Sequence, residues 1–229
     1  MIKVLKFGGS SLASGETFAK VKKIVEADPS RAIVVVSAPG KRFSGDTKVT
    51  DLLYILHAHI KYNAPYNDIF EKIKERYREI YYSCKLEQDL ETELINIEAN
   101  LNKKTSVDYI VSRGEYLNGI IMANYLGYEF IDAATVIFFN NNGEFDAETT
   151  QEILSAKLAN IERAVIPGFY GARPDGVVKT FSRGGSDVTG SIVARAVYAD
   201  LYENWTDVSG FLVADPRIID DPAVITTIT

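Results

Sequence analysis

An apolar strand that runs directly into a pair of glycines, residues 3–14 (KVLKFGGSSLAS), constrains the fold of this chain most. The apolar residues of the segment that follows, 18–25, recur with helical spacing, so the pattern predicts a strand, a glycine turn and a helix. Such a junction directs backbone N–H groups and a helix dipole at one place, where a phosphate fits. Lys6 would stand at the end of the strand. From these residues alone, an ordinary strand-to-helix turn remains the alternative.

A second strand is predicted for residues 32–40 (AIVVVSAPG), where a β-branched run is closed by Pro-Gly. Its continuous apolar character is typical of a strand that is buried on both faces. A strand, a helix and a second strand form a parallel unit. The length of 229 residues permits one α/β domain or two small ones, and 46% apolar with 24% charged residues is enough for a large core.

The rest of the chain alternates helical and strand-like segments. Between residues 49 and 104 the helical period is interrupted near 65–67 and 83–85, which predicts three helices. The further predicted elements are a helix at 105–126, strands at 128–133 and 135–139, a helix at 147–160 and a strand at 164–167.

Composition excludes several functional classes. The net charge of −6 and the pI near 5.1 argue against broad nucleic-acid binding. A single cysteine, Cys84, excludes an internal disulfide, and the presence of only two histidines, His57 and His59, argues against a histidine metal cluster. The longest apolar run is too short to cross a bilayer, and the N-terminus lacks the apolar core of a signal peptide. We therefore expect a cytoplasmic protein without a membrane partner.

Two later segments repeat the logic of the first junction. In residues 179–199, an Arg183-Gly184-Gly185 turn precedes Ser186, a predicted helix cap, and Asp187 in the first turn. In residues 204–218, a hydroxyl and acid pair follows a strand. Taken singly, these are ordinary helix-start and turn residues. In an open parallel sheet, however, such loops gather at the carboxyl ends of the strands, where ligands bind.

Two other segments concern the surroundings of such a site. Gly114 interrupts the predicted helix at 105–126, and its cost in helix stability indicates close approach of a ligand or a neighbouring side chain. The alternative is an exposed ion pair of Arg113 and Glu115 beside a packing glycine. The loop at 39–48 is polar and contains glycine, so it is a candidate flexible cover, and it lacks a P-loop motif.

These segments together resemble the catalytic domain of aspartokinases, a branch of the amino acid kinase family. The pairing of KFGG with SRGE is quite specific to aspartokinases, whereas the second glycine pair is shared with acetylglutamate, glutamate and uridylate kinases. The resembling motifs cover nearly the whole chain in the family's order and are KFGGSS (6–11), VSAPGK (36–41), VTDLL (49–53), SRGE (112–115), VIPGFYG (165–171), SRGGSD (182–187) and WTDVSGFLVADPR (205–217).

The resemblance implies a three-layer αβα sandwich with a mainly parallel sheet. It also implies Mg²⁺-dependent transfer of a phosphoryl group from ATP to the side chain of L-aspartate, which gives 4-phospho-L-aspartate in the lysine, threonine and methionine biosynthetic branch. The implied site residues are Lys6 and Asp187 for catalysis, Lys6, Gly8, Gly9, Ser10, Thr206, Asp207, Leu212 and Arg217 for the nucleotide, and Thr50, Glu115 and Arg183 for aspartate, with Glu115 on its amino group and Arg183 on a carboxylate.

The chemistry agrees with this residue set. A carboxylate with a reference pKa of about 3.9 is ionised at neutral pH, so an attacking aspartate needs no general base. Catalysis then depends on alignment and on neutralising phosphate charge, for which lysine, arginine, N–H groups and Mg²⁺ are suited. The scarcity of histidine is therefore no objection.

Two features depart from the family pattern. Many relatives carry tyrosine where this chain has Leu212, so contacts with the base are expected to differ. The chain stops at Thr229 within a strand-like segment. We therefore expect residues 1–229 to be a catalytic domain truncated at its C-terminal end, without the paired ACT domains of relatives, and we expect the full-length protein to form a homo-oligomer.

Two alternatives remain open at this point. A glutamate or acetylglutamate kinase would keep the glycine junctions but lack SRGE, and a comparison of the three substrates distinguishes it from an aspartokinase. A non-catalytic fragment that binds a nucleotide or an amino acid would show binding without turnover.

Overall fold

The computed structural model describes residues 1–87, 89–182, 184–206, 210–213 and 218–225. Its main sheet is parallel, with the strand order β3-β4-β2-β1-β7. The strands of this sheet are β1 (Lys3–Phe7), β2 (Arg31–Val36), β3 (Glu129–Phe130), β4 (Ala164–Pro167) and β7 (Leu201–Trp205). Two antiparallel pairs accompany it, β5 (Tyr170–Ala172) with β6 (Val178–Thr180) and β8 (Phe211–Leu212) with β9 (Val224–Ile225).

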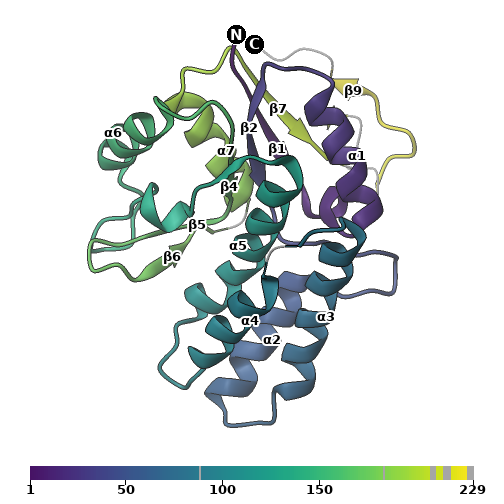
Figure 1. Ribbon diagram of the computed structural model, residues 1–229, viewed down its shortest axis with the longest axis vertical. Helices are drawn as coiled ribbons and strands as arrows, with labels where there is room; N and C mark the ends of the chain where they lie inside the picture. Colours follow the sequence, from purple (N-terminus) through teal and green to yellow (C-terminus); the bar gives the residue numbers. More distant parts are fainter. Residues whose placement is uncertain (88, 183, 207–209, 214–217, 226–229) are drawn as a thin grey trace.

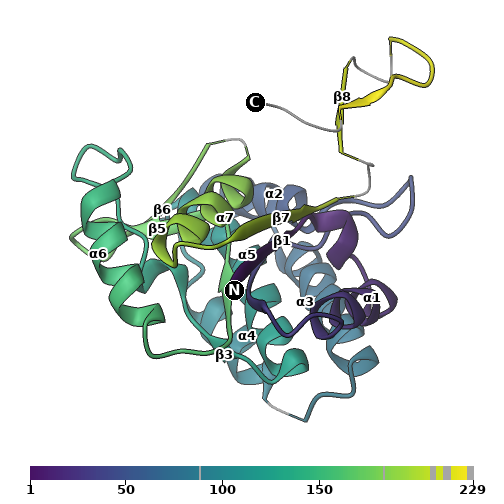
Figure 2. The same ribbon diagram turned by 90° about the horizontal axis from the view of Figure 1, so that it is seen from above.

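Helices cover both faces of the sheet (Figures 1 and 2). One face packs against α1 (Gly15–Glu26), α2 (Val49–Lys61), α3 (Asn67–Ser83), α4 (Leu90–Ala99) and α5 (Val107–Leu126) in a single apolar cluster. The other face packs against α6 (Ala147–Leu158) and α7 (Gly185–Ala196). The predicted three-layer αβα sandwich is thereby confirmed. Among the described helices, none has both the length and the apolarity to cross a membrane.

Strand β1 shows how the sheet positions a polar side chain. Successive side chains of a strand point to opposite faces, so Leu5 and Phe7 pack on the α1 side while Val4 packs on the α7 side. Lys6 falls on the same face as Val4. It therefore lies next to α7 at the carboxyl end of β1, the edge at which a parallel sheet binds ligands.

Most predicted elements are observed, including the three helices between residues 49 and 104 and the strand at 164–167. The strands predicted at 128–133 and 135–139 are mostly wrong. Only Glu129–Phe130 joins the sheet, and a 3-10 helix, η2 (Ala133–Thr135), follows. The side chain of Asp132 accepts a hydrogen bond from the N–H of Ala134 at 3.0 Å. This local bond competes with strand pairing and turns the chain.

Candidate active site

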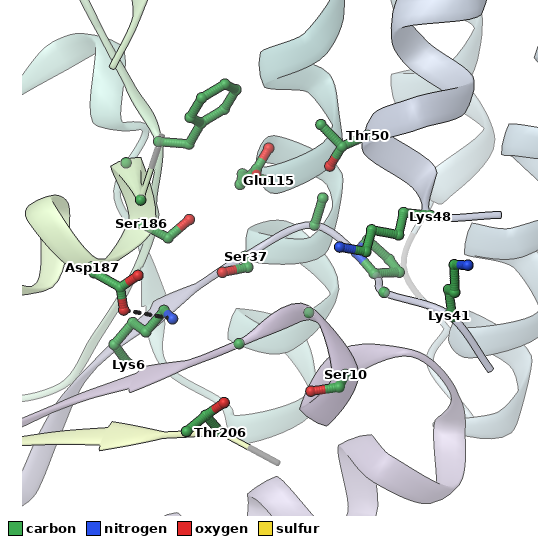
Figure 3. A pocket seen from close by; sticks show the side chains of 18 of the residues that line it. Lys6, Ser10, Ser37, Lys41, Lys48, Thr50, Glu115, Ser186, Asp187 and Thr206 are labelled. Atoms are coloured by element: carbon green, nitrogen blue, oxygen red, sulfur yellow. Dashed lines mark ion pairs between the residues drawn. The ribbon is translucent and has the colours of Figure 1, made fainter. Parts of the chain in front are cut away.

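A cavity of about 960 Å³ lies at the carboxyl ends of β1 and β2, beside the start of α7 (Figure 3). It brings together residues that are more than a hundred positions apart in the sequence. The predicted site residues that line it are Lys6, Gly8, Gly9, Ser10, Thr50, Glu115, Asp187 and Thr206. Arg183, Asp207 and Arg217 lie outside the described residues, as does the side chain of Leu212 in β8.

An ion pair between Lys6 and Asp187 crosses from β1 to α7. The Lys6 Nζ lies 2.7 Å from the Asp187 Oδ1, the Lys6 side chain is 8% exposed, and that of Asp187 is 49% exposed. Asn204 of β7 donates a second hydrogen bond to the same oxygen at 3.0 Å. Within the described part of the chain, the other carboxylate oxygen of Asp187 has no hydrogen-bond partner. This oxygen remains available to a ligand or a cation.

The start of α7 differs from its prediction. Gly184, not Ser186, is the N-cap residue, and its φ of 74° lies in the left-handed region that glycine adopts readily. Because this turn starts the helix early, Ser186 is buried within the first turn. A glycine cap has no side chain to bond the first N–H groups of the helix. The N–H of Asp187 already donates to the carbonyl of Gly184 at 2.9 Å, so the N–H groups of Gly185 and Ser186, with the helix dipole, are the ones that can meet an anion.

The glycine turn after β1 contacts the loop after β2 through its backbone. The N–H of Gly40 donates to the carbonyl of Gly9 at 2.7 Å. A Cβ on Gly40 would lie 2.6 Å from the carbonyl carbon of Gly9, and one on Gly9 would lie 2.8 Å from the carbonyl oxygen of Ala38. Both glycines are therefore required by packing. A Cβ on Gly8 would meet only ordinary contacts, at 3.7 Å or more, so Gly8 is the one that leaves room for a ligand.

We expect Gly40→Ala to lower the free energy of unfolding by about 1–3 kcal/mol, because the added methyl group must push two backbones apart. Gly45→Ala is the matched control in the same loop, since its Cβ would approach only the ring of Phe43, at 3.7 Å. Denaturant unfolding of both variants checks this. Equal stability of the two would contradict the backbone contact.

Glu115 brings a buried carboxylate to the opposite wall of the cavity. It lies in α5, is 4% exposed, and its Oε2 has no hydrogen-bond partner among the described residues. Burial raises the pKa of this carboxyl group to about 8, although hydrogen bonding with the backbone of Ala38 opposes the shift. A buried and incompletely bonded carboxylate that faces a cavity favours a cationic group as its ligand.

The SRGE segment is arranged by packing, and not as an exposed ion pair. Gly114 approaches its neighbours closely, since a Cβ there would lie 2.9 Å from the Cβ of Ala38 and 3.1 Å from Leu53. Arg113 is 7% exposed, and its guanidinium lies over the ring of Tyr116, 4.2 Å from the centroid. The exposed ion-pair interpretation is therefore wrong. The interpretation that a neighbour approaches Gly114 closely is confirmed.

Sequence reasoning missed several lining residues that come from the loop between β2 and α2. Ser37 directly follows β2, so the rule that selected Lys6 at the end of β1 would also have found it. Lys41 and Lys48 belong to the same loop, which was predicted only as a cover. Phe169, with a φ of 80°, also lines the cavity. Such backbone strain in a residue with a side chain is common at functional sites.

A sheet edge with a lysine and a helix start, faced by a buried carboxylate, offers the positive groups that phosphoryl transfer to a small charged molecule requires. The sequence profile described as the amino acid kinase family matches residues 1–229. The chain belongs to this family.

Several proteins similar to this chain are aspartokinases. Aspartokinase 3 of Bacillus subtilis is 37% identical over 242 residues, which cover 100% of this chain and 53% of that protein. The crystal structure of the aspartate kinase of Clostridium acetobutylicum has a TM-score of 0.91 at 54% identity, covering 96% of this chain and 51% of that one. The crystal structure of E. coli aspartokinase III in complex with aspartate and ADP has a TM-score of 0.83 at 27% identity, covering 98% of this chain and 53% of that one. The chain therefore spans about half the length of these relatives.

Proposed function

We propose that this chain is the catalytic domain of an aspartokinase, which transfers the γ-phosphoryl group of ATP to the side-chain carboxylate of L-aspartate. The observation that carries the proposal is the buried carboxylate of Glu115 facing the same cavity as the pair of Lys6 and Asp187. The E. coli relative that is described in complex with aspartate and ADP supports both substrates.

The nucleotide phosphates lie at the glycine turn after β1. Gly8, Gly9 and Ser10 line them, Lys6 neutralises charge on the transferring group, and Asp187 holds Lys6 in place. The aspartate carboxylate oxygen forms a bond to the γ-phosphorus while the bond to the bridging oxygen breaks, and ADP leaves with that electron pair. Because the acceptor is already ionised, no residue has to take up a proton. Thr206, Asp207, Leu212 and Arg217 border the nucleotide in this proposal.

The amino acid lies on the other side of the cavity. The carboxylate of Glu115 pairs with its α-ammonium group, Thr50 donates a hydrogen bond, and Arg183 binds a carboxylate. An ammonium group next to Glu115 compensates the burial of its charge, which a neutral ligand would not do.

Mg²⁺ belongs to the proposal as the ion that accompanies ATP. Within the described residues no three acidic, histidine or cysteine side chains gather as a metal site. Mg²⁺ is commonly held by phosphates, waters and only one or two carboxylates, so it does not require such a cluster. The open oxygen of Asp187 would supply that carboxylate. When bound, the ion neutralises phosphate charge.

An assay of ADP release with aspartate, glutamate and N-acetylglutamate tests the proposal in the full-length protein. We expect turnover with aspartate alone. Turnover only with one of the other two acids would assign another amino acid kinase, and binding of ATP without any turnover would assign a binding module.

Location and assembly are further parts of the proposal. We place the enzyme in the cytoplasm, where ATP and free aspartate occur together, and we expect the full-length protein to form a homo-oligomer. Cell fractionation and light scattering of the purified protein test these two points.

A further inference from the structure

The loop between β2 and α2 presents a lysine to the cavity that has no assigned role. Lys48 is the N-cap residue of α2 and lines the cavity together with Thr50 of the first helical turn. Figure 3 shows its side chain directed from the start of α2 toward the interior of the cavity. Lys6 and Asp187 lie on the opposite side (Figure 3).

The residues proposed to bind aspartate include one cation fewer than the charges of this substrate call for. An aspartate zwitterion with an ionised side chain carries one ammonium and two carboxylate groups, so it calls for one anionic and two cationic partners. Glu115 supplies the anion, and Arg183 is proposed for one carboxylate. Lys6 already faces Asp187 at 2.7 Å, and the proposed function assigns it to the transferring phosphoryl group. One carboxylate therefore still lacks a cation.

Among the residues that the structure describes, no ion pair engages Lys48 elsewhere. No described carboxylate lies within 4.0 Å of its Nζ, which sets it apart from Lys6. It neighbours Thr50 and faces the wall that holds the unpartnered oxygen of Glu115. Thr50 and Glu115 are residues proposed to hold the amino acid, so Lys48 shares their part of the cavity, while Gly40 of the same loop contacts the glycine turn.

The loop holds Lys48 in a defined place. Asp46, two residues earlier, accepts hydrogen bonds from the N–H of Arg42 at 3.0 Å and from the guanidinium of Arg76 at 2.7 Å. Arg76 is 4% exposed and also donates to the carbonyl of Gly40 at 2.8 Å. A buried guanidinium thereby fixes both ends of the loop, and such charge-assisted bonds are stronger than neutral ones.

We propose that Lys48 binds a carboxylate of the amino-acid substrate and that Asp46 is a positioning residue that acts through the loop. This inference rests on the proposed function, because it needs aspartate in the cavity. It adds to that function a residue that selects for a dicarboxylic amino acid.

Steady-state kinetics of Lys48→Met in the full-length protein test the inference. We expect the KM for aspartate to rise about ten- to a hundredfold, the effect of losing one charge-assisted hydrogen bond, while the KM for ATP stays within about twofold. Lys48→Arg keeps the charge and should recover part of the loss. Lys61→Met, at the other end of the same helix, is the matched control and should change neither KM.

The positioning role predicts a specific coupling. Asp46→Asn should raise the KM for aspartate without changing that for ATP, and it should add little further effect in a Lys48→Met background, because both changes act on one contact. Full additivity of the two substitutions would overturn the role of Asp46.

Other outcomes separate the two proposals. An unchanged KM for aspartate in an active Lys48→Met enzyme would overturn the role of Lys48 and leave the aspartokinase proposal intact. A rise in the KM for ATP alone would assign Lys48 to a phosphate and also overturn it. A wild-type protein that does not phosphorylate aspartate would overturn both proposals.

Discussion

Replacing Lys6 by alanine is expected to lower the kcat of phosphoryl transfer by about a hundred- to a thousandfold, by analogy with the loss of one preorganised donor to a developing charge. The Lys6 side chain is 8% exposed, so its charge acts in surroundings where water screens it poorly. Its partner Asp187 holds the ammonium group at the carboxyl end of β1 before any ligand arrives. This arrangement requires little reorganisation during the reaction.

The same substitution should leave the fold intact. Asp187 would lose its lysine, but its side chain is 49% exposed and keeps the hydrogen bond from Asn204. Water can therefore compensate for the missing cation. Lys3→Ala is the matched control on the same strand, since Lys3 pairs with Asp28 at 2.7 Å at the far end of β1.

Assays of ADP release and denaturant unfolding of both variants distinguish the two lysines. Lys3→Ala should affect stability and not kcat, whereas Lys6→Ala should do the reverse. Nearly full activity of Lys6→Ala would mean that Lys6 has no catalytic role and is an ordinary lysine at the end of a strand.

The architecture could be predicted because its signals are local. The apolar runs at residues 3–7 and 31–36 and the helical period of α2, α3 and α5 depend only on neighbouring residues. The position of the site follows from topology, since parallel strands bring their carboxyl ends to one edge. For this reason Lys6 and Asp187 could be placed at one site although they are far apart in the sequence.

The structure differs from the sequence prediction where tertiary contacts or single hydrogen bonds determine the local conformation. Asp132 turns the chain where alternating apolar residues indicated a strand. Arg113 packs against Tyr116 in its own helix and against Tyr170 of β5, and the contact with Tyr170 depends on the tertiary fold and not on spacing within SRGE. Lys48 cannot be predicted from the sequence because a polar loop has no periodic pattern, and the bond between Arg76 and Asp46 that holds the loop at the cavity is a tertiary contact.

Replacing Glu115 by glutamine is expected to weaken aspartate binding by about ten- to a hundredfold, because the charge-assisted bond to the ammonium group is lost while size is kept. Nucleotide affinity should hardly change, since Glu115 lies across the cavity from Lys6. Calorimetric titrations with aspartate and with ATP measure both. Equal loss of the two affinities would indicate a structural role. Glu93→Gln, outside the cavity, is the control.

The pH dependence of stability offers an independent test. Burial raises the pKa of Glu115 from 4.5 to about 8, so between these values the folded protein binds a proton that the unfolded chain has released. This contribution to stability is fully present below pH 4.5 and is lost as the pH rises through about 8. Glu115→Gln cannot lose a proton. Without ligand, it should therefore be the more stable protein at pH 9, measured by denaturant unfolding.

Aspartate binding should couple to the same proton. An ammonium group beside Glu115 favours the ionised carboxylate, so binding near neutral pH releases a proton from a group whose pKa is about 8 in the free protein. The affinity for aspartate should then increase as the pH rises toward 8, and the measured enthalpy should depend on the ionisation enthalpy of the buffer. Glu115→Gln should show neither effect. A wild-type affinity that is independent of pH between 6 and 8 would mean that binding does not change the protonation of Glu115, and it would contradict a pairing of the ammonium group with a carboxyl group that is protonated in the free protein.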